Sequence, residues 1–113
     1  MLFRSGDLQT ALGLAASGRF TEAERILLAL EKQQPQDPEI QYRLGLVLLR
    51  QGKLANAAPR LESASRLRPQ SPLVWLTLAQ VRLRQGNSAQ AARAAERART
   101  RSEERRVGKE CRL

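Results

Sequence analysis

Apolar residues recur along the chain at helical spacing, in short stretches that glycines and prolines interrupt. In the first stretch, Leu8, Ala11, Leu12 and Ala15 share one face of a helix that we expect from about Ser5 to Ala16. The apolar spacing and its interruptions predict six helices in all. They cover about 5–16, 21–33, 38–51, 54–67 and 72–85, and the sixth opens at Asn87. The loops between these helices are only about two to four residues long, and such short loops favour antiparallel packing of neighbouring helices.

Local signals mark where these helices begin and end. Glycines at positions 18, 52 and 86 supply the left-handed residue that often follows a helix. Thr21 and Glu24 have the spacing of a capping box, and Asp37 precedes a proline at the first helical position. Ser71 before Pro72 and Asn87 before Ser88 predict further helix starts. Pro59 falls inside the fourth helix, where it removes one backbone hydrogen bond and bends the helix.

These elements repeat along the chain with a fixed period of about 34 residues. It separates the glycines at 18, 52 and 86, the alanines at 23, 57 and 91, the prolines at 35 and 69, and the prolines at 38 and 72. Such a period indicates an array of small helical units rather than one globular core.

The repeated unit resembles the tetratricopeptide repeat, whose pattern is Trp-x2-Leu-Gly-x2-Tyr, then Ala-x3-Phe, then Pro. The middle unit matches it at Leu44, Gly45, Ala57 and Pro69, with Leu61 in place of Phe. The third unit matches at Trp75, Leu78 and Ala91, has Ala79 in place of Gly and Arg82 in place of the aromatic residue, and shares Ala98 with Ala64 of the middle unit. The first unit is degenerate, with Ala11, Leu14, Ala23, Leu27 and Pro35. The resemblance implies an all-α, right-handed superhelical solenoid of three helix-turn-helix repeats, over about 4–37, 38–71 and 72–100.

In this family the first helix of each pair lines a concave groove that holds a peptide or a partner's helix. The resemblance therefore predicts a protein or peptide ligand and a groove with a leucine floor and an arginine rim. Its residues would be Glu39, Tyr42, Arg43, Leu46, Leu49, Arg50, Leu73, Leu76, Thr77, Gln80, Leu83 and Arg84. Trp75 is expected to pack between helices, and Tyr42 is the better candidate for an exposed aromatic residue. Only Arg43 is basic among the positions that clamp a terminal carboxylate in some members, so that clamp is not expected.

The formal net charge of +9 raises nucleic-acid binding as an alternative. Arg93, Arg97 and Arg99, with Arg82 and Arg84 nearby, would form a basic strip on the last helices. No aromatic residues alternate with these arginines, and acidic residues are interleaved through the body of the chain, so a protein partner is favoured. A second alternative is a regulatory or assembly arm of a larger protein.

Catalysis has little support in the sequence. The chain contains no histidine and one cysteine, Cys111, which excludes imidazole chemistry and an internal disulfide. No phosphate-binding or dinucleotide motif is present. We therefore expect a non-catalytic interaction or scaffold module without metal or cofactor.

The C-terminal segment differs from the body. Residues 101–112 resemble the translation of a short-read sequencing adapter, and the apolar periodicity stops at Arg101. We expect 101–113 to be a non-native or disordered charged tail on a fragment cut near Thr100, with Leu78, Val81 and Leu83 partly exposed at the end of the array. The excess of arginine over lysine suggests a bacterial source. No signal peptide or transmembrane run is evident, so the cytoplasm is the default expectation, and the oligomeric state is left open.

Overall fold

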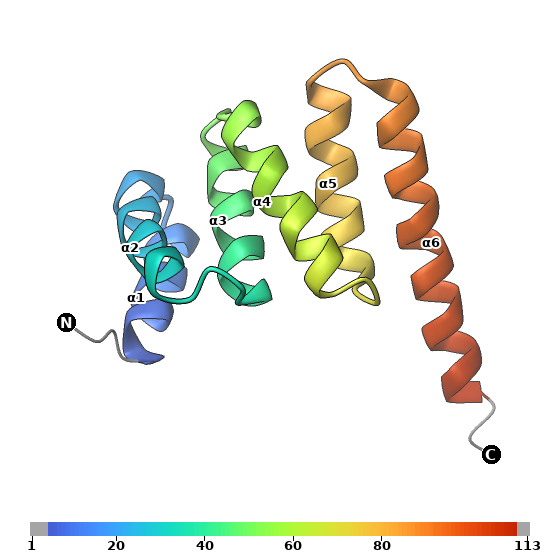
Figure 1. The fold of residues 1–113 in the computed structure, drawn as a ribbon, viewed down its shortest axis with the longest axis horizontal. Coiled ribbons are helices and arrows are strands. Elements are labelled where there is room, and N and C mark those ends of the chain that lie inside the picture. Colours follow the sequence, from blue (N-terminus) through green and yellow to red (C-terminus); the bar gives the residue numbers. More distant parts are fainter. Residues whose placement is uncertain (1–4, 111–113) are drawn as a thin grey trace.

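The computed structural model describes residues 5–110, and over this range every regular element is an α-helix. The helices are α1 (Ser5–Ala16), α2 (Phe20–Gln33), α3 (Pro38–Arg50), α4 (Leu54–Leu67), α5 (Pro72–Arg84) and α6 (Ser88–Glu110). They pack as three antiparallel pairs, the first, middle and third repeats, which follow one another from the N-terminus to the C-terminus (Figure 1). The α-solenoid expected from the sequence is confirmed.

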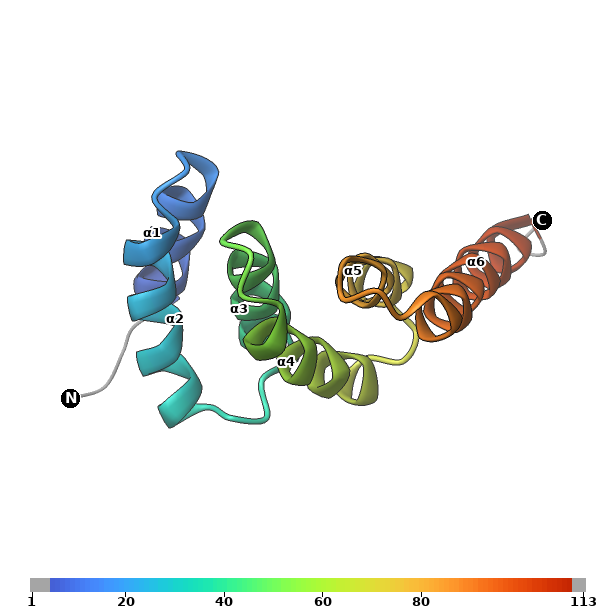
Figure 2. The same cartoon turned by 90° about the horizontal axis from the view of Figure 1, so that it is seen from above.

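Viewed from above, α1, α3 and α5 lie on one side of the array and α2 and α4 on the other (Figure 2). Neighbouring repeats meet where α2 packs on α3 and where α4 packs on α5. The largest fully buried side chains are leucines and one valine from four of the helices, and they form one continuous core. These residues are Leu27, Leu44, Leu48, Leu61 and Val81.

Each helix pair turns at the predicted glycine. Gly18, Gly52 and Gly86 have φ angles of 83°, 79° and 82°, a region that residues with a Cβ rarely adopt. In the middle repeat the amide of Gly52 donates to Leu49 O at 2.9 Å, and the amide of Lys53 donates to Leu48 O at 2.9 Å. This pattern is a Schellman motif, which satisfies the last carbonyls of α3.

Helix starts agree with the sequence in part. The Asp37 carboxylate accepts the amides of Glu39 at 2.9 Å and Ile40 at 3.4 Å, so this N-cap is confirmed. The predicted capping box of Thr21 is wrong, because α2 already begins at Phe20 after Arg19, with no side-chain cap. Ser71 takes the N-cap position of α5 without a side-chain hydrogen bond.

Ion pairs connect the first repeat to the middle repeat. Glu24 accepts Lys53 Nζ at 2.9 Å and Gln51 Nε2 at 2.6 Å. Glu31 accepts Arg60 Nε at 3.1 Å and Gln41 Nε2 at 3.0 Å. Because each carboxylate lies on α2 and its partners come from the next repeat, these bonds set how the two repeats stack.

The end of the array differs from expectation in two ways. Val81 is fully buried and Leu78 is 6% exposed, so of the three residues expected to be partly exposed only Leu83, at 64%, is accessible. The helix α6 continues through Glu110, so residues 101–110 are helical and not disordered, while the alternative that this charged tail is non-native stays a prediction. Cys111 lies outside the described residues.

Candidate functional site

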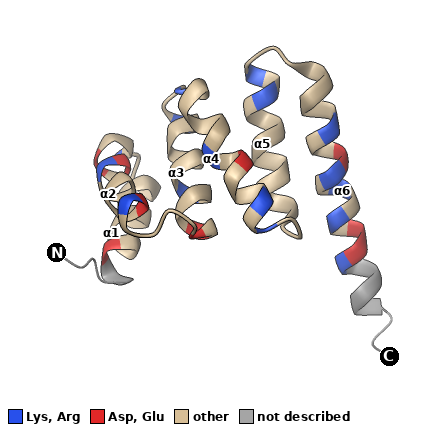
Figure 3. Cartoon of the chain, viewed as in Figure 1, with Lys and Arg blue, Asp and Glu red and all other residues tan. Residues whose placement is uncertain are grey.

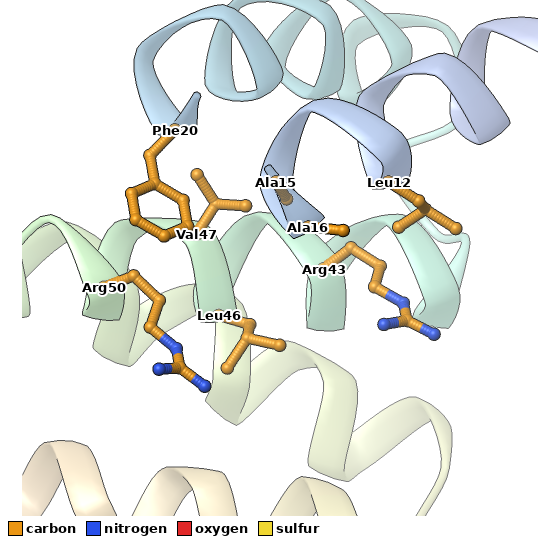
Figure 4. A pocket seen from close by; sticks show the side chains of 8 residues that line it. All are labelled: Leu12, Ala15, Ala16, Phe20, Arg43, Leu46, Val47 and Arg50. Atoms are coloured by element: carbon orange, nitrogen blue, oxygen red, sulfur yellow. The ribbon is translucent and has the colours of Figure 1, made fainter. Parts of the chain in front are cut away.

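A cleft of about 350 Å³ opens between the first repeat and α3. Figure 4 shows its side chains, which come from α1, the start of α2 and one side of α3. The lining residues are Leu12, Ala15, Ala16, Phe20, Arg43, Leu46, Val47 and Arg50. We call this site the α1–α3 cleft. Six of these eight side chains are hydrocarbon, so its floor suits an apolar group.

The repeat register explains why these residues meet. Leu12 on α1 and Leu46 on α3 occupy the same position of consecutive repeats, so both face the same side of the array. Ala15 and Ala16 are small and leave room beside them, while Phe20 opens α2 with a half-buried ring. The cleft is therefore a product of stacking two repeats, with leucines at the centre and alanines at one wall.

Two arginines rim the cleft and differ in their surroundings. Arg43 Nε donates to Glu39 Oε1 at 2.8 Å, and its guanidinium lies 5.5 Å from the centre of the Tyr42 ring. Arg50 is exposed, and among residues 7–105, whose side chains the structure describes, it has no ion pair. The cleft thus presents one partly neutralised guanidinium and one that is available to a carboxylate.

The residues predicted for the groove lie in different surroundings in the structure. Arg43, Leu46 and Arg50 come together in the α1–α3 cleft. Tyr42 and Leu49 are only 7% and 5% exposed and do not line the cleft, so they offer little surface to a ligand. They are covered where the third repeat packs on the middle one. Tyr42 is consequently not an exposed aromatic residue.

The predicted groove residues of α5 do not join this cleft. Thr77 is 4% exposed and its hydroxyl donates to Leu73 O at 2.9 Å, so it too offers little surface to a ligand. Leu73, Leu76 and Leu83 are exposed on α5, and Gln80 is exposed among them.

Two charged residues of the predicted groove, Arg84 and Glu39, interact with neighbouring residues. Arg84 Nη1 donates to Leu49 O at 3.3 Å, across the boundary between the middle and third repeats. Besides Arg43, Glu39 pairs with Arg68, whose Nη1 lies 3.4 Å from Glu39 Oε2. Both therefore contribute to stacking and to local charge balance rather than to the cleft floor.

The sequence analysis missed the half of the cleft that the first repeat supplies. Leu12, Ala15, Ala16 and Phe20 were not among the predicted groove residues. The signal at Leu12 was its register with Leu46, which marks it as the same groove position one repeat earlier. The degenerate motif of the first repeat hid the contribution of this helix pair.

The aromatic and basic residues near α6 are largely engaged. Trp75 is partly buried against the core, as expected, and its indole N–H donates to Pro69 O at 2.9 Å. The guanidinium of Arg97 lies 5.0 Å from the centre of its ring. Arg82 pairs with Glu62, and Arg99 Nη2 lies 2.5 Å from Glu96 Oε1.

The described residues contain no group of three or more potential metal-ligating His, Cys, Asp or Glu side chains. In that same part of the chain, no helix combines the length and apolar character needed to cross a membrane.

These features define a helical-repeat protein of stacked antiparallel pairs. Two family models described as tetratricopeptide repeat match the chain, one over residues 8–72 and one over residues 48–106. The chain belongs to the tetratricopeptide repeat family. Among curated protein sequences, none matches it.

Solved structures with the same fold include proteins from several systems. The globular C-terminal domain of P. aeruginosa LpoP is 30% identical, with a TM-score of 0.74 over 87% of this chain and 99% of that domain. PcrH, in complex with the chaperone binding region of PopD, is 17% identical, with a TM-score of 0.84 over 87% and 74% of the two chains. The Yersinia enterocolitica type III secretion translocator chaperone SycD is 19% identical, with a TM-score of 0.83 over 85% and 66%. Membership of this repeat family identifies the chain as a protein–protein interaction module.

Proposed function

We propose that the chain is a non-catalytic module that binds a peptide or helix segment of a partner protein in the α1–α3 cleft. The bound segment carries an apolar side chain that enters the cleft, and an aspartate or glutamate next to it. The observation that carries this proposal is the apolar floor of the cleft with the exposed Arg50 at its edge.

Apolar burial and charge would both favour such a segment. An apolar side chain buried against Leu46 and Phe20 loses contact with water, which contributes about 1.5–3 kcal/mol for a residue of leucine size. The guanidinium of Arg50 can then form paired hydrogen bonds with a carboxylate, which favours acidic segments over basic ones. Arg43 adds positive charge on the same rim although it is shared with Glu39. The structure of PcrH with a segment of PopD supports peptide recognition by this fold.

The test is selection from a random peptide library displayed on phage. Peptides that the wild-type chain captures are then passed over a Leu46→Asp variant. Those that bind the variant are discarded, because they bind outside the cleft. We expect the retained peptides to share an apolar residue beside Asp or Glu. For a retained peptide, Arg50→Glu should weaken binding at least about tenfold, while Arg50→Lys keeps part of the affinity.

Leu83→Asp is the matched control, because Leu83 is also a leucine on a first helix of a repeat but is 64% exposed and outside the cleft. It should leave the affinity of those peptides unchanged, and circular dichroism should show equal helicity for all variants. A selection that retains no peptide after removal of those that bind Leu46→Asp, or retained peptides that lack acidic residues, would refute the assignment of the cleft.

The nucleic-acid alternative receives less support from the arrangement of charges. Red and blue segments alternate along α6 in Figure 3, and Arg99 pairs there with Glu96 and Glu103. Arginines held by carboxylates on their own helix give a weaker field for a phosphate backbone. Binding of a generic DNA duplex at low salt, with a steep loss as salt rises, would instead favour this alternative.

A further inference from the structure

A second apolar surface lies on the other end of the array. Leu73, Leu76 and Leu83 are 55%, 47% and 64% exposed, and they are the exposed large hydrophobic residues of the described chain. All three are on α5. Leu73 and Leu76 border a hollow of about 450 Å³ between α5 and α6, which we call the end hollow. The end hollow is lined by Pro72, Leu73, Leu76, Ala95, Ala98, Arg99 and Ser102.

The middle repeat shows what such a surface accommodates. Leu76 and Leu83 correspond, one repeat earlier, to Tyr42 and Leu49, which are 7% and 5% exposed. These residues are covered because α5 packs against α3 and α4. The same surface on the third repeat therefore has the shape and polarity to receive one more helix in the position that α5 takes on the middle repeat.

The opposite end of the array is different. On α3 and α5, the positions that face the preceding repeat include Leu44 with Val47, and Leu78 with Val81, all buried. On α1 the equivalent positions are Thr10 and Gly13, and both are exposed. A second copy stacked head to tail would place this polar side of α1 on the exposed leucines. The occupant therefore needs an apolar face that α1 lacks.

The packing of α5 specifies that face. Val74, Leu78 and Val81 are spaced i, i+4, i+7 and are 3%, 6% and 0% exposed at the boundary with the middle repeat. Arg82, which follows them, pairs with Glu62 of α4. The residue that corresponds to Glu62 on the third repeat is Glu96, now paired with Arg99 on its own helix. A helix with the pattern of α5 would find both the apolar surface and a carboxylate for its basic residue.

We propose that the end hollow and the adjoining leucines of α5 bind an amphipathic α-helix of another polypeptide, whose apolar face has i, i+4, i+7 spacing and is followed by a basic residue. This site is separate from the α1–α3 cleft and does not depend on it.

The test uses the full chain and a fluorescein-labelled peptide of residues 71–87, which carries the α5 pattern. Fluorescence anisotropy should show saturable binding to the wild-type chain. Leu76→Glu and, independently, Leu83→Glu should each weaken binding at least about tenfold, because each loses the burial of one leucine. Both residues are exposed, so these variants should keep the helicity of the wild type.

Two controls separate this site from the cleft and from nonspecific capture. Leu46→Glu should leave binding of the 71–87 peptide unchanged, so failure here is distinct from failure of the cleft proposal. A peptide with Leu78→Glu should not bind, because its apolar face is interrupted. Absence of saturable binding, or equal binding to Leu76→Glu, would overturn the proposal. A dimer of the chain alone that Leu76→Glu dissociates would also overturn it, in favour of a second copy as occupant.

Discussion

The two helices of the middle repeat approach each other where Gly45 of α3 faces Leu61 of α4. A Cβ added at Gly45 would lie 2.6 Å from Leu61 Cγ and 2.9 Å from one of its methyl carbons. Carbon atoms in favourable contact are about 3.5–4.0 Å apart. Because Leu61 is fully buried, the contact cannot be relieved by moving into solvent. In the third repeat, the positions equivalent to Gly45 and Leu61 hold Ala79 and Ala95.

We expect Gly45→Ala to have opposite effects in two backgrounds. With Leu61 present, overpacking costs about 1–3 kcal/mol, and the better helix propensity of alanine offsets about 1 kcal/mol of it. The variant should therefore be about 1 kcal/mol less stable than the wild type. In a Leu61→Ala background, which itself costs about 2–5 kcal/mol, the clash is absent and the same substitution should stabilise by about 1 kcal/mol. The two residues are thus coupled by about 2 kcal/mol.

Urea unfolding of the four proteins, followed by circular dichroism at the helix band, measures the cycle. Gly13→Ala on α1 is the matched control, because nothing lies within 4 Å of a Cβ added there and only helix propensity should act. That variant should be slightly more stable than the wild type. If Gly45→Ala changes stability by the same amount and sign with Leu61 and with Ala at position 61, the packing argument is refuted.

Two further predictions concern α4 and the boundary between repeats. Pro59 is exposed inside α4, so Pro59→Ala should restore a backbone hydrogen bond and raise the free energy of unfolding by about 1–3 kcal/mol. Pro38→Ala is the control, because a proline at the start of α3 costs no hydrogen bond, and it should change the free energy of unfolding little. Equal effects of the two substitutions in urea unfolding would contradict this prediction. The hydrogen bond from Lys53 is the main cause that lowers the pKa of Glu24 below its ordinary value of 4.5. Since the folded pKa is depressed, the stabilisation, about 0.5–1 kcal/mol for this partly exposed pair, is present at neutral pH and is lost as the pH falls below about 4.5. Glu24→Gln should therefore be less stable than the wild type at pH 7, with a difference that shrinks toward pH 3; a difference independent of pH would contradict the assignment.

Much of the fold follows from local signals that the sequence carries in full. The helix-ending glycines require a left-handed backbone, and the Asp37 carboxylate caps the helix that starts immediately after it. The fixed repeat period places equivalent residues at equivalent sites in each repeat. These signals act over a few residues or through strict repetition, so they predicted the helices, their pairing and the solenoid.

The candidate site depended on contacts between repeats, which the sequence pattern does not resolve. Tyr42 and Leu49 lie on the predicted face of α3, yet the third repeat covers them, while Arg43 and Leu46 on the same helix stay open to the cleft. A helical face spans a wide arc, and only the position of the neighbouring helix determines which part of it is buried. Leu76, at the position of Tyr42, is exposed because the described chain places no helix on it. The sequence by itself therefore determined the repeat, and the stacking of repeats decided which of its residues can meet a partner.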